Sequence, residues 1–215
     1  MRFKARGVVS SAVVGLLRTE SDRLAAAEPD AAHGIRDLPA KSPIVRHHLT
    51  APWLQALLPA GYGCVRGILF DKRADANWLV AWHQDLTICV KERQQVAGYG
   101  PWSVKHGVPH VQPPMALLDA MITLRLHLDE ATHSNGALRV LPGTHRFGRL
   151  DAQQIEAFKK EGVEETCTAA AGDVLLMKPL LLHASSKAES PAHRRVVHLE
   201  FAPLHSLAAC LQWHE

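Results

Sequence analysis

The chain has 215 residues, 47% of them hydrophobic and 21% charged, which is the composition of a folded globular protein and excludes disorder as the default. The formal net charge is only +3, and the lysines and arginines form no basic stripe, which argues against a nucleic-acid surface. The four cysteines are widely spaced, so neither a disulfide framework nor a zinc cluster is expected, and a reducing cytoplasm fits best.

The N-terminal segment superficially looks like a signal peptide, because a basic start precedes an apolar stretch at 7–17. However, Ser10 and Ser11 interrupt the apolar stretch, and no small-x-small cleavage site follows it. No apolar run in the chain reaches the length needed to span a bilayer. We therefore expect a cytoplasmic protein without a membrane segment.

The first 63 residues predict a helix followed by an irregular segment. Ser10 or its neighbour can cap a helix that runs to about Ala27, where Pro29 closes it. Prolines and glycines recur throughout residues 28–63, so this stretch is expected to wrap the surface, with one short helix near Trp53 to Leu58.

The residues that follow change to the two-residue period of β-strands. Residues 64–70 and 78–87 are short β-type runs separated by a polar segment, which predicts a hairpin. Residues 91–120 contain many prolines and glycines, and a loop of this length is typical of a lid or substrate wall. Residues 121–128 alternate most clearly, with leucines and an isoleucine on one face and threonine, arginine and histidine on the other.

The second half of the chain predicts a further series of short strands. Asp151 can cap a helix through about Lys160, and strands are expected at 137–141, 164–169, 174–178, 180–184 and 195–201. About eight short strands with few helices favour a mainly β protein, which we expect to be a double-stranded β-helix, the jelly-roll barrel of cupins. We expect a single domain over 1–215, with an N-terminal wrap at 1–63 and a jelly-roll core at 64–202.

One short polar stripe has the residue types of a metal site. In an extended segment His83, Asp85 and Thr87 point to the same face, and one imidazole with one carboxylate is two thirds of a two-His, one-carboxylate iron site. With 14 histidines, chance alone gives roughly 0.65 His-x-Asp pairs. A second pair does occur at His127 and Asp129, so the motif by itself does not decide which pair binds a metal.

Four blocks of sequence in a fixed order resemble the phytanoyl-CoA dioxygenase family of Fe(II)- and 2-oxoglutarate-dependent oxygenases, over roughly residues 64–202. The blocks are Trp82-His83-Gln84-Asp85, the segment from Asn135-Gly136 to Pro142-Gly143-Thr144-His145, Gly172-Asp173-Val174-Leu175-Leu176, and His183-Ala184-Ser185 followed by Arg194. In this comparison the pair at 127 and 129 matches the strand before the Asn-Gly turn, and so is not the metal motif.

The resemblance implies a role for each matching residue. It implies that His83, Asp85 and His183 bind iron and that Arg194 holds the far carboxylate of 2-oxoglutarate, with hydroxyl groups matching Ser185 and Thr87 assisting. A planar guanidinium suits this task because it can donate two parallel hydrogen bonds to a carboxylate. Arg195, which points to the other strand face, remains the alternative anchor, since a register of one residue is uncertain from sequence.

The resemblance also implies the reaction. Fe(II), 2-oxoglutarate and O2 would be used to hydroxylate a small organic molecule, with release of succinate and CO2. Related halogenases replace the metal-binding carboxylate by a small residue, so the presence of Asp85 favours hydroxylation. An acyl-CoA substrate is not assumed, because this chain is shorter than many members of the family.

The substrate and the oligomeric state are not determined by the sequence. Lys105 and Arg125 are candidate contacts to a polar or anionic substrate, and Trp102 is a candidate apolar wall. Alternatively Arg125 pairs with Asp129 or Glu130. Two other functions remain open: a cupin-like isomerase or hydrolase that uses another metal, and a non-catalytic binding protein of the same fold.

Overall fold

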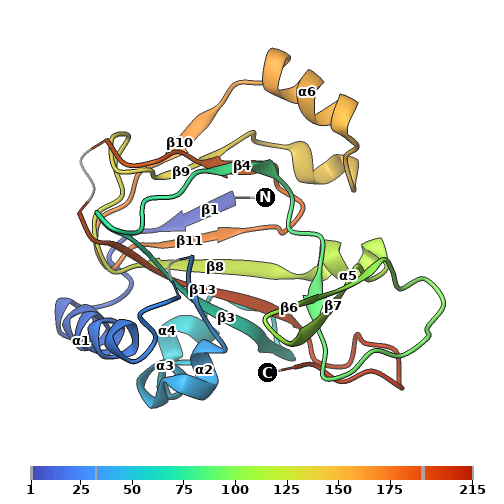
Figure 1. The fold of residues 1–215 in the computed structure, drawn as a ribbon, viewed down its shortest axis with the longest axis horizontal. Coiled ribbons are helices and arrows are strands. Elements are labelled where there is room, and N and C mark those ends of the chain that lie inside the picture. Colours follow the sequence, from blue (N-terminus) through green and yellow to red (C-terminus); the bar gives the residue numbers. More distant parts are fainter. Residues whose placement is uncertain (1, 32, 190–191, 215) are drawn as a thin grey trace.

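The computed structural model describes residues 2–31, 33–189 and 192–214 and consists mainly of antiparallel β-strands. A six-stranded sheet, in the order β1-β11-β8-β13-β3-β2, lies opposite a four-stranded sheet in the order β10-β9-β12-β4 (Figure 1). This is the jelly-roll arrangement that the strand pattern predicted. The space between the two sheets is where the polar residues of both sheets meet.

The six-stranded sheet is built around β13, which pairs with β8 on one side and β3 on the other. Its strands are β1 (Arg2–Ala5), β11 (Val174–Met177), β8 (Ile122–His127), β13 (Arg194–Pro203), β3 (Tyr62–Lys72) and β2 (Ile35–Arg36). Because side chains alternate along a strand, the sheet has one apolar and one polar face. Leu124, Leu126 and Val197 pack into the main apolar core on the first face.

The four-stranded sheet carries short strands: β10 (Glu165–Cys167), β9 (Leu138–Val140), β12 (His183–Ser185) and β4 (Val80–His83). A third sheet of β5 (Ile88–Cys89), β7 (Val108–Val111) and β6 (Trp102–Lys105) lies beside helix α5 (Met115–Ala120) at one end of the molecule (Figure 1).

Helices cover the apolar face of the six-stranded sheet. Helix α1 (Ser11–Ala27) begins at Ser10, whose hydroxyl accepts the backbone N–H of Val13, and it buries Val14, Leu17 and Leu24 against that face. Helices α2 (Leu38–Lys41), α3 (Pro43–His48) and α4 (Pro52–Gln55) lie on the same side (Figure 1). In the described part of the chain, no helix combines the length and the apolar character needed to cross a membrane.

Helix α6 (Ala152–Glu161) projects beyond the four-stranded sheet, and the short 3-10 helix η1 (Thr144–Phe147) precedes it (Figure 1). The predicted cap is confirmed: Asp151 accepts the backbone N–H of Gln154, whose side chain in turn accepts the backbone N–H of Asp151.

Two expectations for the middle of the chain are wrong. Residues 64–70 and 78–87 do not form a hairpin, because β3 pairs with β13 and β2 whereas β4 pairs with β12 in the other sheet. The intervening segment therefore crosses from one sheet to the other. Residues 91–120 are not one structureless loop, since they contain the β6–β7 hairpin and α5.

Smaller differences concern strand limits. The strand expected at 180–184 begins at His183, and strand β1 at the N-terminus was not predicted. Strand β1 pairs with β11, which lies more than 160 residues away in the sequence, so no local pattern indicated it.

His127 lies on the inner face of β8 and is only 1% exposed. Neither ring nitrogen has a hydrogen-bond partner within the described residues. Burial, together with the nearby charges of Arg125 and Arg194, lowers the pKa of His127 to about 3. Between about pH 3 and pH 6.5 the histidine is therefore neutral in the folded protein, whereas its unfolded counterpart is protonated.

This burial predicts a specific loss of stability in acid. Between pH 6.5 and about 3 the unfolded chain binds a proton at His127 that the folded chain does not, so the free energy of unfolding falls as the pH falls. In His127→Leu the free energy of unfolding should fall less steeply with decreasing pH. The difference from the wild type should be up to about 1.4 kcal/mol per pH unit below pH 6. Urea denaturation at pH 7, 6 and 5 measures the effect.

The matched control is His133→Gln, which alters an exposed histidine in a turn. It should leave the pH dependence of the free energy of unfolding unchanged. Equal slopes for wild type and His127→Leu would contradict the prediction.

Candidate metal centre and the adjoining cavity

Three polar side chains converge where β4 and β12 lie side by side. His83 is the last residue of β4 and pairs across the sheet with His183, the first residue of β12, and their ring centroids are 4.2 Å apart. Asp85 follows just beyond β4, where its backbone N–H donates to the carbonyl oxygen of Pro179. Its two carboxylate oxygens lie 3.6 Å from the Nε2 atoms of the two histidines.

Backbone contacts fix the orientation of both imidazole rings. The Nδ1–H of His83 donates to the carbonyl oxygen of Ala81 at 2.8 Å, and that of His183 donates to Leu181 at 2.7 Å. Each Nε2 atom therefore presents its lone pair toward Asp85, as metal-binding histidines do. The three ligand atoms lie within 4.8 Å of one another, which is close enough to hold one metal ion.

The charge states suit a divalent cation. Burial raises the pKa of Asp85, but the imidazoles of His183 and His83 outweigh burial, and the net pKa is well below its usual range. Burial lowers the pKa of His183 to about 4. Burial also lowers the pKa of His83, but the adjacent Asp85 carboxylate, 3.6 Å away, raises the net value. An ionised carboxylate beside a neutral imidazole is ready to coordinate a metal.

The residue between the ligands holds the segment in place. Gln84 is buried, and its Nε2 atom donates to the carbonyl oxygens of Gly148 and Leu180, at 2.8 and 2.7 Å. Its Oε1 atom accepts the backbone N–H of Leu150 at 2.8 Å. Because these three bonds anchor the chain between His83 and Asp85, Gln84 positions two ligands without touching the metal site itself.

A cavity of about 160 Å³ adjoins the three ligands and lies between the two sheets. The four-stranded sheet contributes His83, His183 and Ser185, and the polar face of the six-stranded sheet contributes most of the rest. Five cationic side chains line it: Arg36, Arg66, Lys72, Arg125 and Arg194. Asp85 is the one carboxylate among the described residues that line the cavity, so the cavity is strongly positive.

Arg194 has its guanidinium inside this cavity and is only 3% exposed. Its Nε and Nη1 atoms have no hydrogen-bond partner in the described part of the chain. Burial, together with the charge of Arg125, lowers its pKa to about 10. A buried guanidinium with unpaired donors is costly unless an anion completes it.

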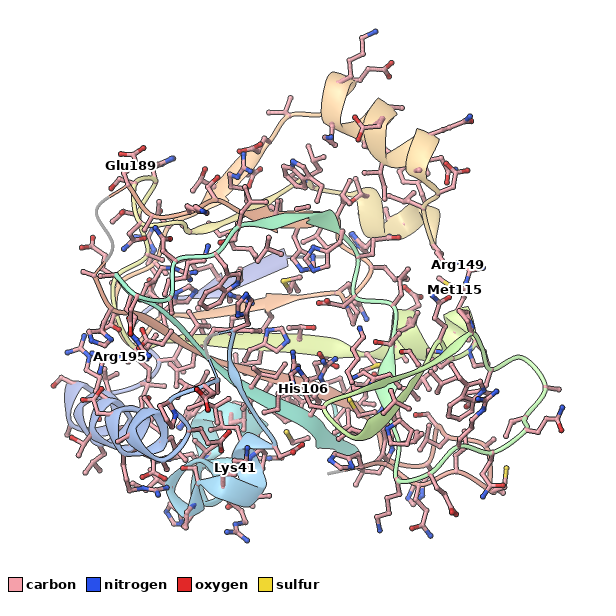
Figure 2. The ribbon with its side chains drawn as sticks, viewed as in Figure 1. Lys41, His106, Met115, Arg149, Glu189 and Arg195 are labelled. Carbon is pink, nitrogen blue, oxygen red and sulfur yellow. The ribbon has the colours of Figure 1, made fainter. Side chains whose placement is uncertain are left out.

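Arg195 lies on the opposite face of β13. Its guanidinium binds both carboxylate oxygens of Asp129, at 2.8 and 3.1 Å, and Oδ1 of Asp22 at 2.9 Å. Figure 2 shows it at the outer edge of the sheet near α1. Arg195 is therefore already neutralised outside the cavity, and of the two candidate anchors only Arg194 faces the metal ligands.

Ser185 and Lys72 form a buried pair beside Arg194. The Ser185 hydroxyl donates to the carbonyl oxygen of Gly136 at 2.8 Å and accepts from the Lys72 ammonium at 2.7 Å. Lys72 is the register partner of Arg194. Burial lowers the pKa of Lys72 to about 7, and the charge of Arg194 adds to this effect. Its ammonium meets neutral acceptors, the Ser185 hydroxyl and the Ser186 carbonyl oxygen.

The remaining predicted residues lie elsewhere. Arg125 lines the cavity, and its Nη1 atom lies 3.0 Å from Nδ1 of His198 rather than against Asp129 or Glu130, the alternative partners. Thr87 is half-buried and lies outside the set of described residues that line the cavity.

The two other substrate candidates, Trp102 and Lys105, belong to β6. Trp102 packs against the apolar cluster around α5, and Lys105 is exposed. Neither is among the described lining residues of the cavity.

The sequence reasoning missed several lining residues. Arg66, Ile68, Phe70 and Lys72 occupy alternate positions of β3 and all face the cavity. This two-residue period is visible in the sequence, where residues 64–70 were predicted only as a strand of a hairpin. Arg36 lies in a two-residue strand, which is too short to show any period.

The residues present fit a two-His, one-carboxylate iron site with an anionic ligand beside it. Two imidazole nitrogens and one carboxylate on one side leave coordination positions open toward the cavity. The unpaired donors of Arg194 lie across the same cavity, where a carboxylate can accept two hydrogen bonds from them.

One known protein family matches most of the chain. The family model described as phytanoyl-CoA dioxygenase (PhyH) matches residues 7–196. No curated protein matches the chain. Solved structures with a similar fold include HygX from Streptomyces hygroscopicus with nickel and 2-oxoglutarate bound, at 17% identity and a TM-score of 0.66, covering 94% of this chain and 82% of that chain.

Two further structures have similar scores. EctD from S. alaskensis with bound Fe is 20% identical, with a TM-score of 0.70 over 94% of this chain and 73% of that chain. The non-heme alpha ketoglutarate dependent epimerase SnoN from nogalamycin biosynthesis is 16% identical, with a TM-score of 0.68 over 93% of this chain and 76% of that chain. At such identities the likeness shows a common fold.

The bonds of Gln84 predict that it controls metal affinity. Gln84→Ala should lower the affinity for Co²⁺ or Ni²⁺ by about 10- to 100-fold, because the segment that carries His83 and Asp85 loses its anchor. It should also lower the free energy of unfolding by about 2 to 4 kcal/mol, because three buried backbone groups lose their partner. Calorimetric metal titration and urea denaturation measure the two effects.

Gln154→Ala is the control, because it removes the capping box of α6, away from the metal ligands. It should cost about 1 kcal/mol of stability and leave metal affinity unchanged. If Gln84→Ala binds the metal as tightly as the wild type, Gln84 has no positioning role.

Proposed function

The chain belongs to the phytanoyl-CoA dioxygenase family, and from this premise we propose that it is an Fe(II)- and 2-oxoglutarate-dependent oxygenase that hydroxylates a small organic molecule. One observation carries the proposal. A two-His, one-carboxylate set opens onto a cavity in which a buried guanidinium, that of Arg194, lacks an anionic partner.

In this proposal His83 and His183 bind the metal through Nε2 and Asp85 binds it through its carboxylate. The hydrogen bonds from the two Nδ1 atoms keep the rings oriented and keep the Nε2 lone pairs available. When bound, the iron and 2-oxoglutarate supply the oxidising chemistry, in which O2 is consumed and succinate and CO2 are released. Nickel or iron in the similar structures of HygX and EctD supports such a site.

Arg194 binds the far carboxylate of 2-oxoglutarate through its unpaired donors. The negative charge offsets the burial of the guanidinium, which is why an anion is favoured there over water. Ser185 lies beside this position, with its hydroxyl held by Gly136 and Lys72. A bound 2-oxoglutarate in HygX supports the assignment of this co-substrate.

Apolar lining limits the access of water to the reacting region. Ile68, Phe70, Trp78, Val80 and Leu138 line the cavity together with the polar groups. Where these apolar groups exclude water, the electrostatic contacts to the ligands are stronger and side reactions with solvent are fewer. A HygX structure with hygromycin B bound supports a small-molecule substrate for this fold, although the identity of the substrate is specific to each protein.

An epimerase reaction is the second candidate. SnoN, which has a similar fold, is described as an alpha ketoglutarate dependent epimerase, so the same architecture can change a stereocentre. Hydroxylation adds one oxygen atom to the product and epimerisation adds none. Mass spectrometry of the product therefore separates the two reactions once a substrate is identified.

The proposed roles predict a separation between two variants. Under anaerobic conditions the wild type with Fe(II) and 2-oxoglutarate should show a weak visible charge-transfer band. Arg194→Gln should bind 2-oxoglutarate about 10- to 100-fold more weakly and keep its iron, because a charge-assisted pair of hydrogen bonds is lost. His183→Ala should lose the iron itself.

Metal content and titration of the band by 2-oxoglutarate distinguish these effects. Arg146→Gln, an exposed arginine in η1, is the control and should behave as the wild type. The absence of both the band and succinate formation in the wild type would falsify the proposed function. Equal loss of iron in Arg194→Gln and His183→Ala would contradict the separate roles.

A further inference from the structure

The cavity holds more positive charge than the proposed iron and co-substrate can use. Among its five cations, Arg66 is paired with Glu200 at 3.2 Å. Arg194 is assigned to the co-substrate, and the ammonium of Lys72 is held by Ser185 and Ser186. Arg125 and Arg36 remain, and no carboxylate among the described residues forms a hydrogen bond or ion pair with either.

Arg36 occupies a position between the metal cavity and the outside. It lies on β2, where it pairs with Ile68 of β3, and its side chain lines the cavity of the metal ligands. It also lines a surface groove of about 780 Å³, whose lining includes Lys41, His106 and the carboxylates of Glu28, Asp30 and Asp37. Figure 2 shows His106 at the tip of the β6–β7 hairpin and Lys41 at the end of α2. Arg36 therefore lies where the cavity of the metal ligands meets the surface groove, a position that we call the mouth of the cavity.

The guanidinium of Arg36 is partly buried without an anionic partner. Burial lowers its pKa, and the positive charge of Arg66 lowers it further. The neighbouring carboxylate of Asp37 is engaged by Nε2 of His214 at 3.1 Å, and that of Glu200 is engaged by Arg66. A half-buried guanidinium that no carboxylate contacts directly is stabilised by an anion that accepts its hydrogen bonds.

The register of the sheet separates this position from the co-substrate anchor. Arg194 pairs with Lys72, whereas Arg36, Ile68, His198 and Arg125 form one row across the sheet. The two rows are four residues apart along β13, which is about 13 Å of backbone. One 2-oxoglutarate with a carboxylate on Arg194 and its other end at the metal does not also neutralise Arg36.

We propose that the organic substrate carries an anionic group, a carboxylate or a phosphate, and that Arg36 binds it at the mouth of the cavity. This inference rests on the proposed function, since it names the substrate class of the same site. The guanidinium donates two hydrogen bonds to the anion, and the rest of the substrate extends inward toward the metal ligands. Arg125, in the same row of the sheet, adds positive charge on the inner side.

The test uses protein loaded with Mn(II) and saturating 2-oxoglutarate, because Mn(II) is paramagnetic and reports small molecules near the metal. The probes are two pairs, each of an acid and its neutral amide: benzoate with benzamide, and butyrate with butyramide. Their binding is measured by proton relaxation. Inorganic phosphate is followed by ³¹P relaxation. The acids or phosphate should show saturable enhancement that the amides lack.

Arg36→Gln should weaken this anion binding by about 10- to 100-fold and leave the affinity for 2-oxoglutarate unchanged. Arg36→Lys should retain part of the binding because it keeps the charge. Arg46→Gln, an exposed arginine on α3, should match the wild type. If relaxation is enhanced only for the carboxylates, the substrate carries a carboxylate. If it is enhanced only for phosphate, the substrate carries a phosphate.

Two results would overturn the proposal. The first is that no anion binds better than its neutral partner. The second is that Arg36→Gln weakens 2-oxoglutarate as much as the probes, which would assign Arg36 to the co-substrate. A failure of the proposed function is distinct, because it appears as loss of Mn(II) or 2-oxoglutarate binding in the wild type itself. In that case anion binding to the metal-free protein, compared between Arg36→Gln and Arg194→Gln, still tests Arg36.

Discussion

Arg194, Arg125 and Lys72 hold their charged groups between two β-sheets, where burial lowers the pKa of each. Like charges in such a space repel one another, and water does not fully replace the missing counter-ions. Anionic ligands relieve this repulsion, and any ligand that binds only the folded state stabilises it. The candidate metal ligands His83, Asp85 and His183 face these cations across the cavity.

The strands that line the cavity also build the main core. On β8 and β13, apolar side chains pack against the helical layer while the alternate residues face the metal site. Because side chains alternate strictly along a strand, a shift of register by one residue would bury the cations in the core and expose the leucines. The position of Arg194 is therefore fixed by the packing of Val197 and Leu199.

The two His-x-Asp pairs of the chain show how environment separates identical motifs. His83 and Asp85 meet a second histidine across the sheet, and Gln84 anchors the segment between them. His127 is buried without a partner among the described residues, and Asp129 points outward to Arg195 and Arg18. The residue types are the same, but only the first pair has a third ligand within reach.

The sequence by itself determined two kinds of feature: those set by neighbouring residues, and those set by motifs that follow one another in a fixed order. The capped helices at 11–27 and 152–161 and the alternation of 122–127 followed from neighbouring residues, and the candidate ligands and Arg194 followed from the order of four blocks. The tertiary structure alone decided that β3 and β4 separate into different sheets, and that Arg36, Lys72 and Arg125 converge on one cavity. Strand partners far apart in the chain are selected by the packing of whole sheets, and no local period records that choice.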